Sequence, residues 1–358
     1  MRALTESNRT VERRYKMIRV GIVGLGRQGM LHLMNCSCFA DIRVVAAADK
    51  SKKQLSRAKS LSISSLYENY EDMFRAHKDL NTVIISLPNF LHETSIQSAL
   101  ECGFNVFVEK PLANTTSECQ HIVDAVRRTG MKFMIGHNHR FYEAIEKMKE
   151  YSEKGYIGDI EAITGEEVTN GPFSHPVVPS PVAEWWFDPT KTGGGVLMDV
   201  GYHLIDLFRF IAGDADLLYS EFGHRLRLPV EDSAVVVLKS SLLTKGLIYV
   251  GWYQRTTFPR FDFRFILHGN AGYLSTEDLI PRNLYTFAAK EGMKNVLRKM
   301  TGRKIKPLRY TYYYESYYKE LAHFFDCIRN DRTPSVTAED GLKAIEIIDK
   351  AYKQTRRD

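Results

Sequence analysis

Short apolar runs and amphipathic stretches alternate along the first part of the chain. The apolar runs fall at residues 18–23, 42–48, 82–87, 105–108 and 132–135. Between them, stretches such as 92–102 and 116–128 carry apolar residues at the spacing of a helix. Strands that alternate with helices form parallel sheets with helices on both faces. We therefore predict an α/β domain with a doubly wound parallel sheet for residues 17–137.

The pattern changes after residue 137, where longer apolar runs follow one another with few helices between them. These runs cover residues 158–168, 233–240, 246–253 and 260–268. Such a series favours a mostly antiparallel open sheet, which helices cover on one face while the other face is left for a partner. We predict an α+β domain at 138–358 that binds substrate and forms a homodimer or homotetramer through its sheet. Helices are expected at about 315–329 and 338–354.

Composition and charge narrow the class of protein further. A chain of 358 residues with 44% hydrophobic and 26% charged residues suits two ordinary domains. Residues 1–16 hold five basic and two acidic residues, which is half of the net charge of +6, and we predict a disordered basic tail there. The remaining charge is scattered, so we expect no nucleic-acid partner. No apolar run is long enough to cross a bilayer and the five cysteines include no CxxC pair, so we expect no membrane partner and a cytoplasmic location.

The first strand leads directly into a glycine-rich turn, GLGRQG, with glycines at 24, 26 and 29. In a strand–turn–helix unit these glycines serve a tight turn, a close approach to a pyrophosphate and close packing of the helix. Asp49 follows the second strand, where a carboxylate meets ribose hydroxyls and repels a 2′-phosphate. The pattern predicts a dinucleotide site that favours NAD, although Lys50, Lys52 and Lys53 leave NADP open.

Two segments carry candidate catalytic groups. Lys110 follows the strand 105–108, and the carboxyl ends of parallel strands are where such sheets bind ligands. Asp199 and His203 stand four residues apart behind three glycines, so both side chains should share one helix face. An imidazole that a carboxylate orients suits the role of general base. A buried Asp and His that only satisfy each other's hydrogen bonds, without a catalytic role, are an equal alternative. A metal site would need a third ligand that the sequence does not supply, so none is expected.

In their order and spacing these segments resemble the glucose-fructose oxidoreductase, inositol dehydrogenase and rhizopine-catabolism (Gfo/Idh/MocA) family. The matching segments are VGIVGLGRQG (20–29), SLPNFLH (86–92), EKP (109–111), HNHRF (137–141), FDPTKTGGGVLMDVGYHLIDL (187–207) and PSVTAEDGLKAIEII (334–348). The resemblance implies hydride transfer between a secondary hydroxyl of a sugar, polyol or sugar derivative and NAD. In that reaction His203 would take the hydroxyl proton, Lys110 would hold the oxygen and Asp199 would orient His203.

The resemblance also implies further contacts for the cofactor and the substrate. Cofactor contacts are expected, besides the glycines, Asp49, Lys50 and Lys110, from Arg27, Gln28, Ser86, Pro88, Asn89, His92 and Glu109. Substrate contacts are expected, besides the catalytic trio, from His137, Arg140, Trp185 and Trp186. The basic segment 290–309 and the tyrosines of 310–318 suit a solvated face and a subunit contact, or a site for a phosphate, uronate or nucleotide-sugar.

Two other functions fit the same fingerprint. An enzyme that retains NAD can oxidise its substrate transiently and recycle the hydride, as in cleavage of a glycoside by elimination. A sensor that binds dinucleotide without catalysis would be expected to lose the catalytic groups, whereas Lys110, Asp199 and His203 are all present.

Overall fold

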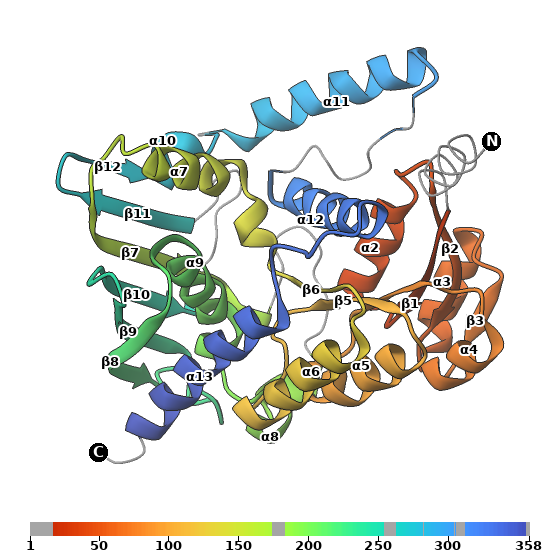
Figure 1. The fold of residues 1–358 in the computed structure, drawn as a ribbon, viewed down its shortest axis with the longest axis horizontal. Coiled ribbons are helices and arrows are strands. Elements are labelled where there is room, and N and C mark those ends of the chain that lie inside the picture. Colours follow the sequence, from red (N-terminus) through yellow and green to blue (C-terminus); the bar gives the residue numbers. More distant parts are fainter. Residues whose placement is uncertain are drawn as a thin grey trace, which may run out of the picture.

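The chain folds around two six-stranded sheets, which Figure 1 shows at opposite ends of the molecule. The structure is a computed structural model that describes residues 17–173, 183–253, 263–281, 283–303, 305 and 312–355. The predicted tail at residues 1–16 lies outside the described residues.

The first sheet is parallel throughout, with the strand order β3-β2-β1-β4-β5-β6. Its strands are β1 (Ile18–Val23), β2 (Ile42–Ala48), β3 (Ser65–Tyr67), β4 (Thr82–Ile85), β5 (Asn105–Glu109) and β6 (Phe133–Gly136). Helices α2 (Arg27–Cys36), α3 (Lys52–Ser60), α4 (Tyr70–Ala76), α5 (His92–Glu101) and α6 (Thr116–Thr129) connect them. The predicted doubly wound sheet is confirmed. The strand order reverses at β1 and β4, which is where such sheets bind a ligand.

The second sheet is mixed, with the order β12-β11-β7-β10-β9-β8. Its strands are β7 (Ile160–Val168), β8 (Ala215–Gly223), β9 (Ser233–Ser240), β10 (Lys245–Gly251), β11 (Phe263–Gly269) and β12 (Gly272–Ser275). Among the described strands of this second sheet, only β7 and β10 pair in parallel. The prediction of a mostly antiparallel sheet is therefore confirmed. The sequence analysis missed β8 and β12, whose side chains are largely exposed and show little hydrophobic alternation.

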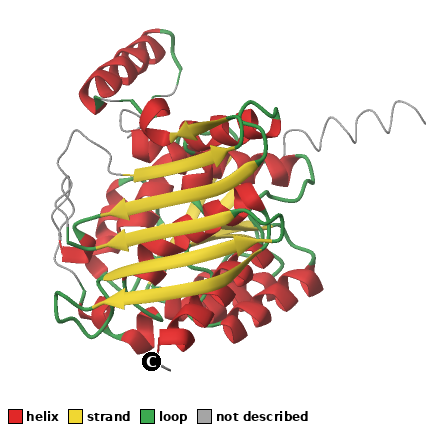
Figure 2. Cartoon of the chain, turned by 90° about the vertical axis from the view of Figure 1, so that its left-hand side faces the viewer, coloured by secondary structure: helices red, strands yellow, loops and turns green. Residues whose placement is uncertain are grey.

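One face of the second sheet is turned to the viewer in Figure 2, and most helices in the view lie behind it. The helices of this half begin with α7 (Glu143–Glu153), α8 (Pro189–Thr192), α9 (Tyr202–Ala212), α10 (Thr276–Leu279) and α11 (Leu284–Met300). Along β10, Gly246 and Ile248 are buried while Lys245 and Leu247 point outward, with Leu247 48% exposed. The outward face therefore keeps apolar side chains in solvent.

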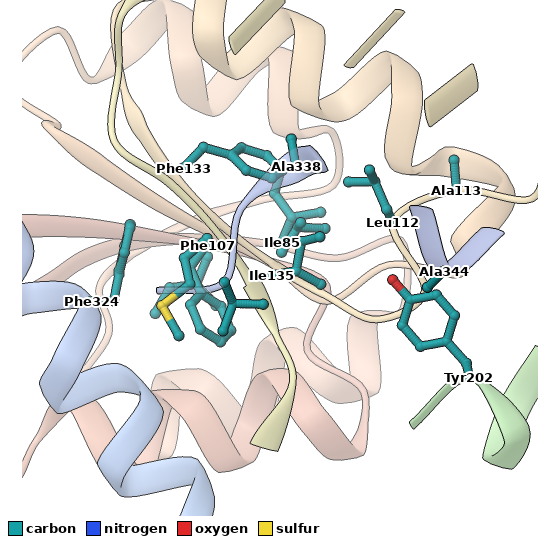
Figure 3. Close-up of a cluster of buried hydrophobic side chains, with 14 of the residues drawn as sticks. Ile85, Phe107, Leu112, Ala113, Phe133, Ile135, Tyr202, Phe324, Ala338 and Ala344 are labelled. Carbon is teal, nitrogen blue, oxygen red and sulfur yellow. The ribbon is translucent and has the colours of Figure 1, made fainter. Parts of the chain in front are cut away.

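The last two helices return to the first sheet and join the two halves. They are α12 (Tyr312–Arg329), which packs on α2, and α13 (Ala338–Thr355), which packs on α6 and β8. Figure 3 shows the resulting core, where Phe107 of β5 and Phe324 of α12 lie with ring centroids 5.7 Å apart. Tyr202 of α9 and Ala344 of α13 belong to the same buried cluster. The boundary at residue 137 stays a prediction, since the core is continuous across it.

Candidate active site

The three glycines of the first turn have three different surroundings. Gly24 has φ of +86°, and a Cβ there would lie 2.5 Å from the carbonyl oxygen of Ser86. A Cβ on Gly29 would lie 1.8 Å from the carbonyl oxygen of Gly24, so this position sets how closely α2 packs on the turn. A Cβ on Gly26 would meet nothing within 4 Å among the described residues. The space over Gly26, at the N-terminus of α2, is thus open to a pyrophosphate.

Asp49 lies at the end of β2, beside this turn. Its carboxylate accepts hydrogen bonds from the backbone N–H groups of Leu25 (2.6 Å) and Ser51 (2.7 Å). The acid is therefore fixed between the glycine turn and the start of α3, which is where an adenosine ribose is expected. Lys50 follows it and is exposed.

The loop after β4 offers polar groups on the same side of the sheet. Neither the buried hydroxyl of Ser86 nor Oδ1 of Asn89 has a hydrogen-bond partner within the described chain. Pro88 precedes the 3₁₀ turn at Asn89–Leu91, and Asn89 donates to the carbonyl oxygen of Thr192 (2.9 Å). This loop therefore joins the two halves beside the predicted cofactor site.

His92 stands behind that loop and is fully buried. Its ring nitrogens lie 2.8 Å from the carbonyl oxygen of Pro111 and 3.0 Å from that of Leu87. Burial lowers the pKa of His92. His92 therefore braces the segment after Lys110, and its expected contact with the cofactor stays a prediction.

Lys110 meets Asp199 at the junction of the two halves. The ammonium Nζ donates to the carbonyl oxygen (2.8 Å) and to Oδ1 (2.9 Å) of Asp199. Asp199 belongs to a π-helical turn at Leu197–Gly201. In such a turn the hydrogen bonds span five residues, so a spacing of four no longer stacks two side chains. No hydrogen bond links Asp199 to His203 among the described contacts, and the expected pairing is replaced by Lys110 with Asp199.

His203 is buried against a second imidazole. The rings of His203 and His139 stack with centroids 3.9 Å apart and an interplanar angle of 25°. His139 Nε2 in turn lies 3.3 Å from Oε2 of Glu167. Burial, reinforced by electrostatic interactions with His139 and Lys110, holds the pKa of His203 well below its usual value. His203 is therefore neutral at neutral pH and able to accept a proton.

The sequence analysis missed His139, although it lies within the segment HNHRF. It singled out His137 and Arg140 instead, and the structure places both in the core. His137 Nδ1 lies 2.7 Å from Asp206 Oδ2, and Arg140 Nε donates to the same oxygen at 2.7 Å. Both side chains are buried and bound to Asp206, which favours a structural role, and their expected contact with substrate stays a prediction. The charge of Arg140 also lowers the pKa of Asp206.

Replacing Asp206 with alanine is expected to lower the free energy of unfolding by about 3–5 kcal/mol, because the buried Arg140 would lose its closest carboxylate and keep only the longer ion pair with Asp340 (3.4 Å). Asp214 provides the control, since its bridge to Arg209 lies at the surface and is worth about 0–1 kcal/mol. Urea unfolding of both variants would measure the difference. Equal, small losses would contradict the structural role assigned to Asp206.

The three glycines before Asp199 pack against other parts of the chain. A Cβ on Gly194 would lie 1.8 Å from the hydroxyl of Tyr352, and one on Gly195 would lie 2.0 Å from the carbonyl oxygen of Glu231. The buried carboxylate of Glu231 accepts from the N–H groups of Gly195 (2.9 Å) and Leu197 (3.0 Å). Glu231, which the sequence analysis missed, thus anchors the turn that carries Asp199.

Of the remaining cofactor candidates, two interact with α12 and one with α2. Gln28 donates to the hydroxyl of Tyr317 (2.9 Å). Burial alone would lower the pKa of Arg27. Electrostatic interactions with Tyr313, Tyr317 and, more weakly, Asp199 outweigh this effect, so the pKa of Arg27 is raised. Glu109 Oε1 lies 2.6 Å from His32 Nε2, on the side of α2.

The two tryptophans lie in the 3₁₀ turn at Glu184–Phe187. Their rings stack with centroids 5.1 Å apart, and Trp185 also meets the edge of Phe90 at 6.0 Å. Phe90 belongs to the loop after β4, so Trp185 is the closer of the two to the predicted cofactor site. The expected contacts of both rings with the substrate stay a prediction.

The parallel sheet, the open glycine turn and the acid after β2 define a dinucleotide-binding oxidoreductase with a second, sheet-based domain. Comparison with family models agrees with this class. Residues 18–137 match the model "Oxidoreductase family, NAD-binding Rossmann fold", and residues 149–358 match "Oxidoreductase family, C-terminal alpha/beta domain". The chain belongs to the Gfo/Idh/MocA family of oxidoreductases, with NAD as its cofactor.

Similar proteins include named polyol dehydrogenases. An inositol 2-dehydrogenase of Rhizobium meliloti is 26% identical over 94% of this chain and 96% of its own length. A scyllo-inositol 2-dehydrogenase (NAD(+)) of Bacillus subtilis is 26% identical over 92% of each chain. The fold matches that of scyllo-inositol dehydrogenase from Lactobacillus casei with bound NAD(H) and scyllo-inositol, with a TM-score of 0.76, 22% identity and coverage of 95% and 98%. Within the described chain, none of the helices has the length and apolar character needed to span a membrane.

Proposed function

We propose that the protein is an NAD-dependent dehydrogenase that oxidises a secondary hydroxyl of a sugar or polyol, with a cyclic polyol of the inositol type as the first candidate. The observation that carries the proposal is the ammonium of Lys110 beside Asp199, with the neutral imidazole of His203 nearby in the fold. The names of the relatives support the substrate class. The described geometry fits NAD, since the turn over Gly26 is open and Asp49 is fixed beside it.

Bound NAD supplies the acceptor for the hydride that leaves the hydroxyl-bearing carbon. An ammonium has three N–H donors, and Asp199 accepts two hydrogen bonds from Lys110. The third donor remains for the substrate oxygen, on which negative charge develops as the carbonyl forms. His203 takes the hydroxyl proton, and its stacking on His139 fixes the plane of its ring.

The experiment that tests this proposal follows NADH formation with cyclic polyols, sugars, uronates and nucleotide-sugars. Activity on one class, lost in a Lys110 variant, would support it. If NAD binds and no compound reduces it, an enzyme that recycles its hydride or a sensor would replace the proposed dehydrogenase.

Asp49 sets the expected choice between the two dinucleotides. Replacing it with serine is expected to weaken NAD binding about tenfold or more, because a charge-assisted hydrogen bond to ribose contributes about 1.5–3 kcal/mol. NADP binding should change little or improve, since the repulsion of a 2′-phosphate is removed. Calorimetric titration of both cofactors checks this, with the exposed Asp72 changed to serine as a control. An unchanged preference would show that the neighbouring lysines dominate.

We also propose that copies of the chain associate through the open face of the second sheet. Leu218, Tyr219, Leu247 and Tyr273 are 47–63% exposed on its strands, which is unusual for a surface that stays in water. Light scattering after size exclusion measures the molar mass of the assembly. Leu247→Lys should lower that mass, and an unchanged mass would point to another surface.

A further inference from the structure

Three ionisable side chains meet in the core between the first sheet and α12. They are His32 of α2, Glu109 at the end of β5 and Glu320 of α12, exposed by 0%, 6% and 0%. One nitrogen or oxygen from each lies within 4.8 Å of the others. Figure 1 shows α2 and α12 side by side, and they are in contact. Glu109 directly precedes Lys110, but among the described residues no hydrogen bond or ion pair joins this cluster to the pair formed by Lys110 and Asp199.

The contacts within this cluster leave one carboxyl group unexplained. His32 and Glu109 interact at 2.6 Å. Both oxygens of Glu320 are buried and have no hydrogen-bond partner among the described residues. Burial and the charge of Glu109 raise the pKa of Glu320. A carboxyl group with neither oxygen paired is costly in a protein interior, and such a group commonly marks an ion or water.

The walls of the cluster favour an ion over a loose network of water. The rings of Phe107 and Tyr317 pack edge-on to His32, with centroids at 5.2 Å and 6.1 Å. As ligands, an imidazole and two carboxylates would together supply a charge of −2, which a divalent cation would balance. Nitrogen and carboxylate oxygen together are the donors of Zn²⁺ and of related divalent transition metals.

We propose that His32, Glu109 and Glu320 bind a divalent transition-metal ion, with Zn²⁺ as the first candidate. Ligand bonds of about 2.0–2.2 Å need donor atoms roughly 3.3 Å apart, so His32 and Glu109 would separate slightly and Glu320 would close in. The ligands come from three elements far apart in sequence. The ion would therefore tie α12 to β5, which ends one residue before Lys110, and its role is structural.

The test uses the full chain with any affinity tag removed. Metal analysis by mass spectrometry of wild type and Glu320→Gln is expected to find about one Zn²⁺ or related ion per wild-type chain and little in the variant. Glu291→Gln, which changes another buried glutamate, is the matched control and should keep its metal. After treatment with a chelator, added Zn²⁺ should raise the Tm of wild type and of the control but leave that of Glu320→Gln unchanged.

Wild-type measurements decide the matter even where Glu320→Gln does not fold. A wild-type chain that holds no metal as purified, and whose Tm does not respond to Zn²⁺, Mn²⁺ or Co²⁺, would overturn the proposal. A Glu320→Gln variant that keeps full metal content would overturn it equally. In either case Glu320 would be a buried carboxyl group that binds no metal.

Discussion

Replacing Lys110 with methionine is expected to lower kcat by about 10²–10³-fold, with little change in NAD affinity. Methionine keeps much of the length and apolar stem of lysine and removes the only ammonium bound to Asp199 in the described structure. The substrate oxygen would lose its cationic donor while negative charge develops on it. Affinity for NAD should persist, because the glycine turn and Asp49 are untouched. Steady-state kinetics with the substrate found in the panel, and calorimetry with NAD, measure the two quantities separately.

Lys132 offers a matched control for this variant. It directly precedes β6, at the opposite end of the same sheet, and forms an ion pair with the exposed Asp331 at 2.8 Å. Lys132→Met should keep kcat near that of wild type. Near-normal turnover by Lys110→Met would remove Lys110 from the mechanism. An equal loss of kcat in both variants would indicate that the substitutions act by lowering the stability of the sheet.

The features that sequence predicted well are those that local chemistry determines. The roles of Gly24 and Gly29 follow from a strand, a turn and a helix adjacent in sequence, and both positions exclude a Cβ. Lys110 directly follows β5, as expected from the sequence, and its contact with the ligands stays a prediction. The periods of strands and helices predicted both sheets except for three strands. The strand β3 has only three half-buried residues, and β8 and β12 are too exposed to show a pattern.

The features that sequence missed depend on pairs of residues distant in the chain. His137 and His139 stand two residues apart and both are imidazoles, yet one pairs with Asp206 and the other with His203. Nothing local distinguishes them, because their partners lie more than 60 residues away. Glu231 was missed for the same reason, since it acts on the backbone of Gly195.

The π-helical turn at Leu197–Gly201 shows how a regular spacing can mislead. Asp199 and His203 would share a face of an α-helix, and that rule predicts a carboxylate and an imidazole in contact. In the wider turn, the carboxylate of Asp199 instead binds Lys110, and the ring of His203 stacks on His139. The catalytic base would then depend on a second imidazole for its orientation, and the carboxylate would position the ammonium.

His203 gives the second large prediction, because its environment fixes both its role and its pH range. Replacing His203 with asparagine is expected to lower kcat/KM by about 10²–10⁴-fold, the usual contribution of a general base. In wild type, kcat/KM should fall as the pH drops through the pKa of His203, because a protonated imidazole cannot accept a proton. Burial and electrostatic interactions with His139 and Lys110 lower that pKa, so the acid limb of kcat/KM should lie below about 6.5, the ordinary value for histidine.

The asparagine variant should lose this acid limb as well as most of its rate, which separates a chemical role from a merely structural one. His121→Asn is the control, since that imidazole is at the surface beside Glu93 and should leave both rate and profile unchanged. Rates measured from about pH 5 to 9 in buffers of constant ionic strength, with NAD saturating, give the profile. A wild-type limb centred above 6.5, or a variant that keeps both the limb and the rate, would show that another group accepts the proton. His139, stacked on His203 and paired with Glu167, would then be the next residue to replace.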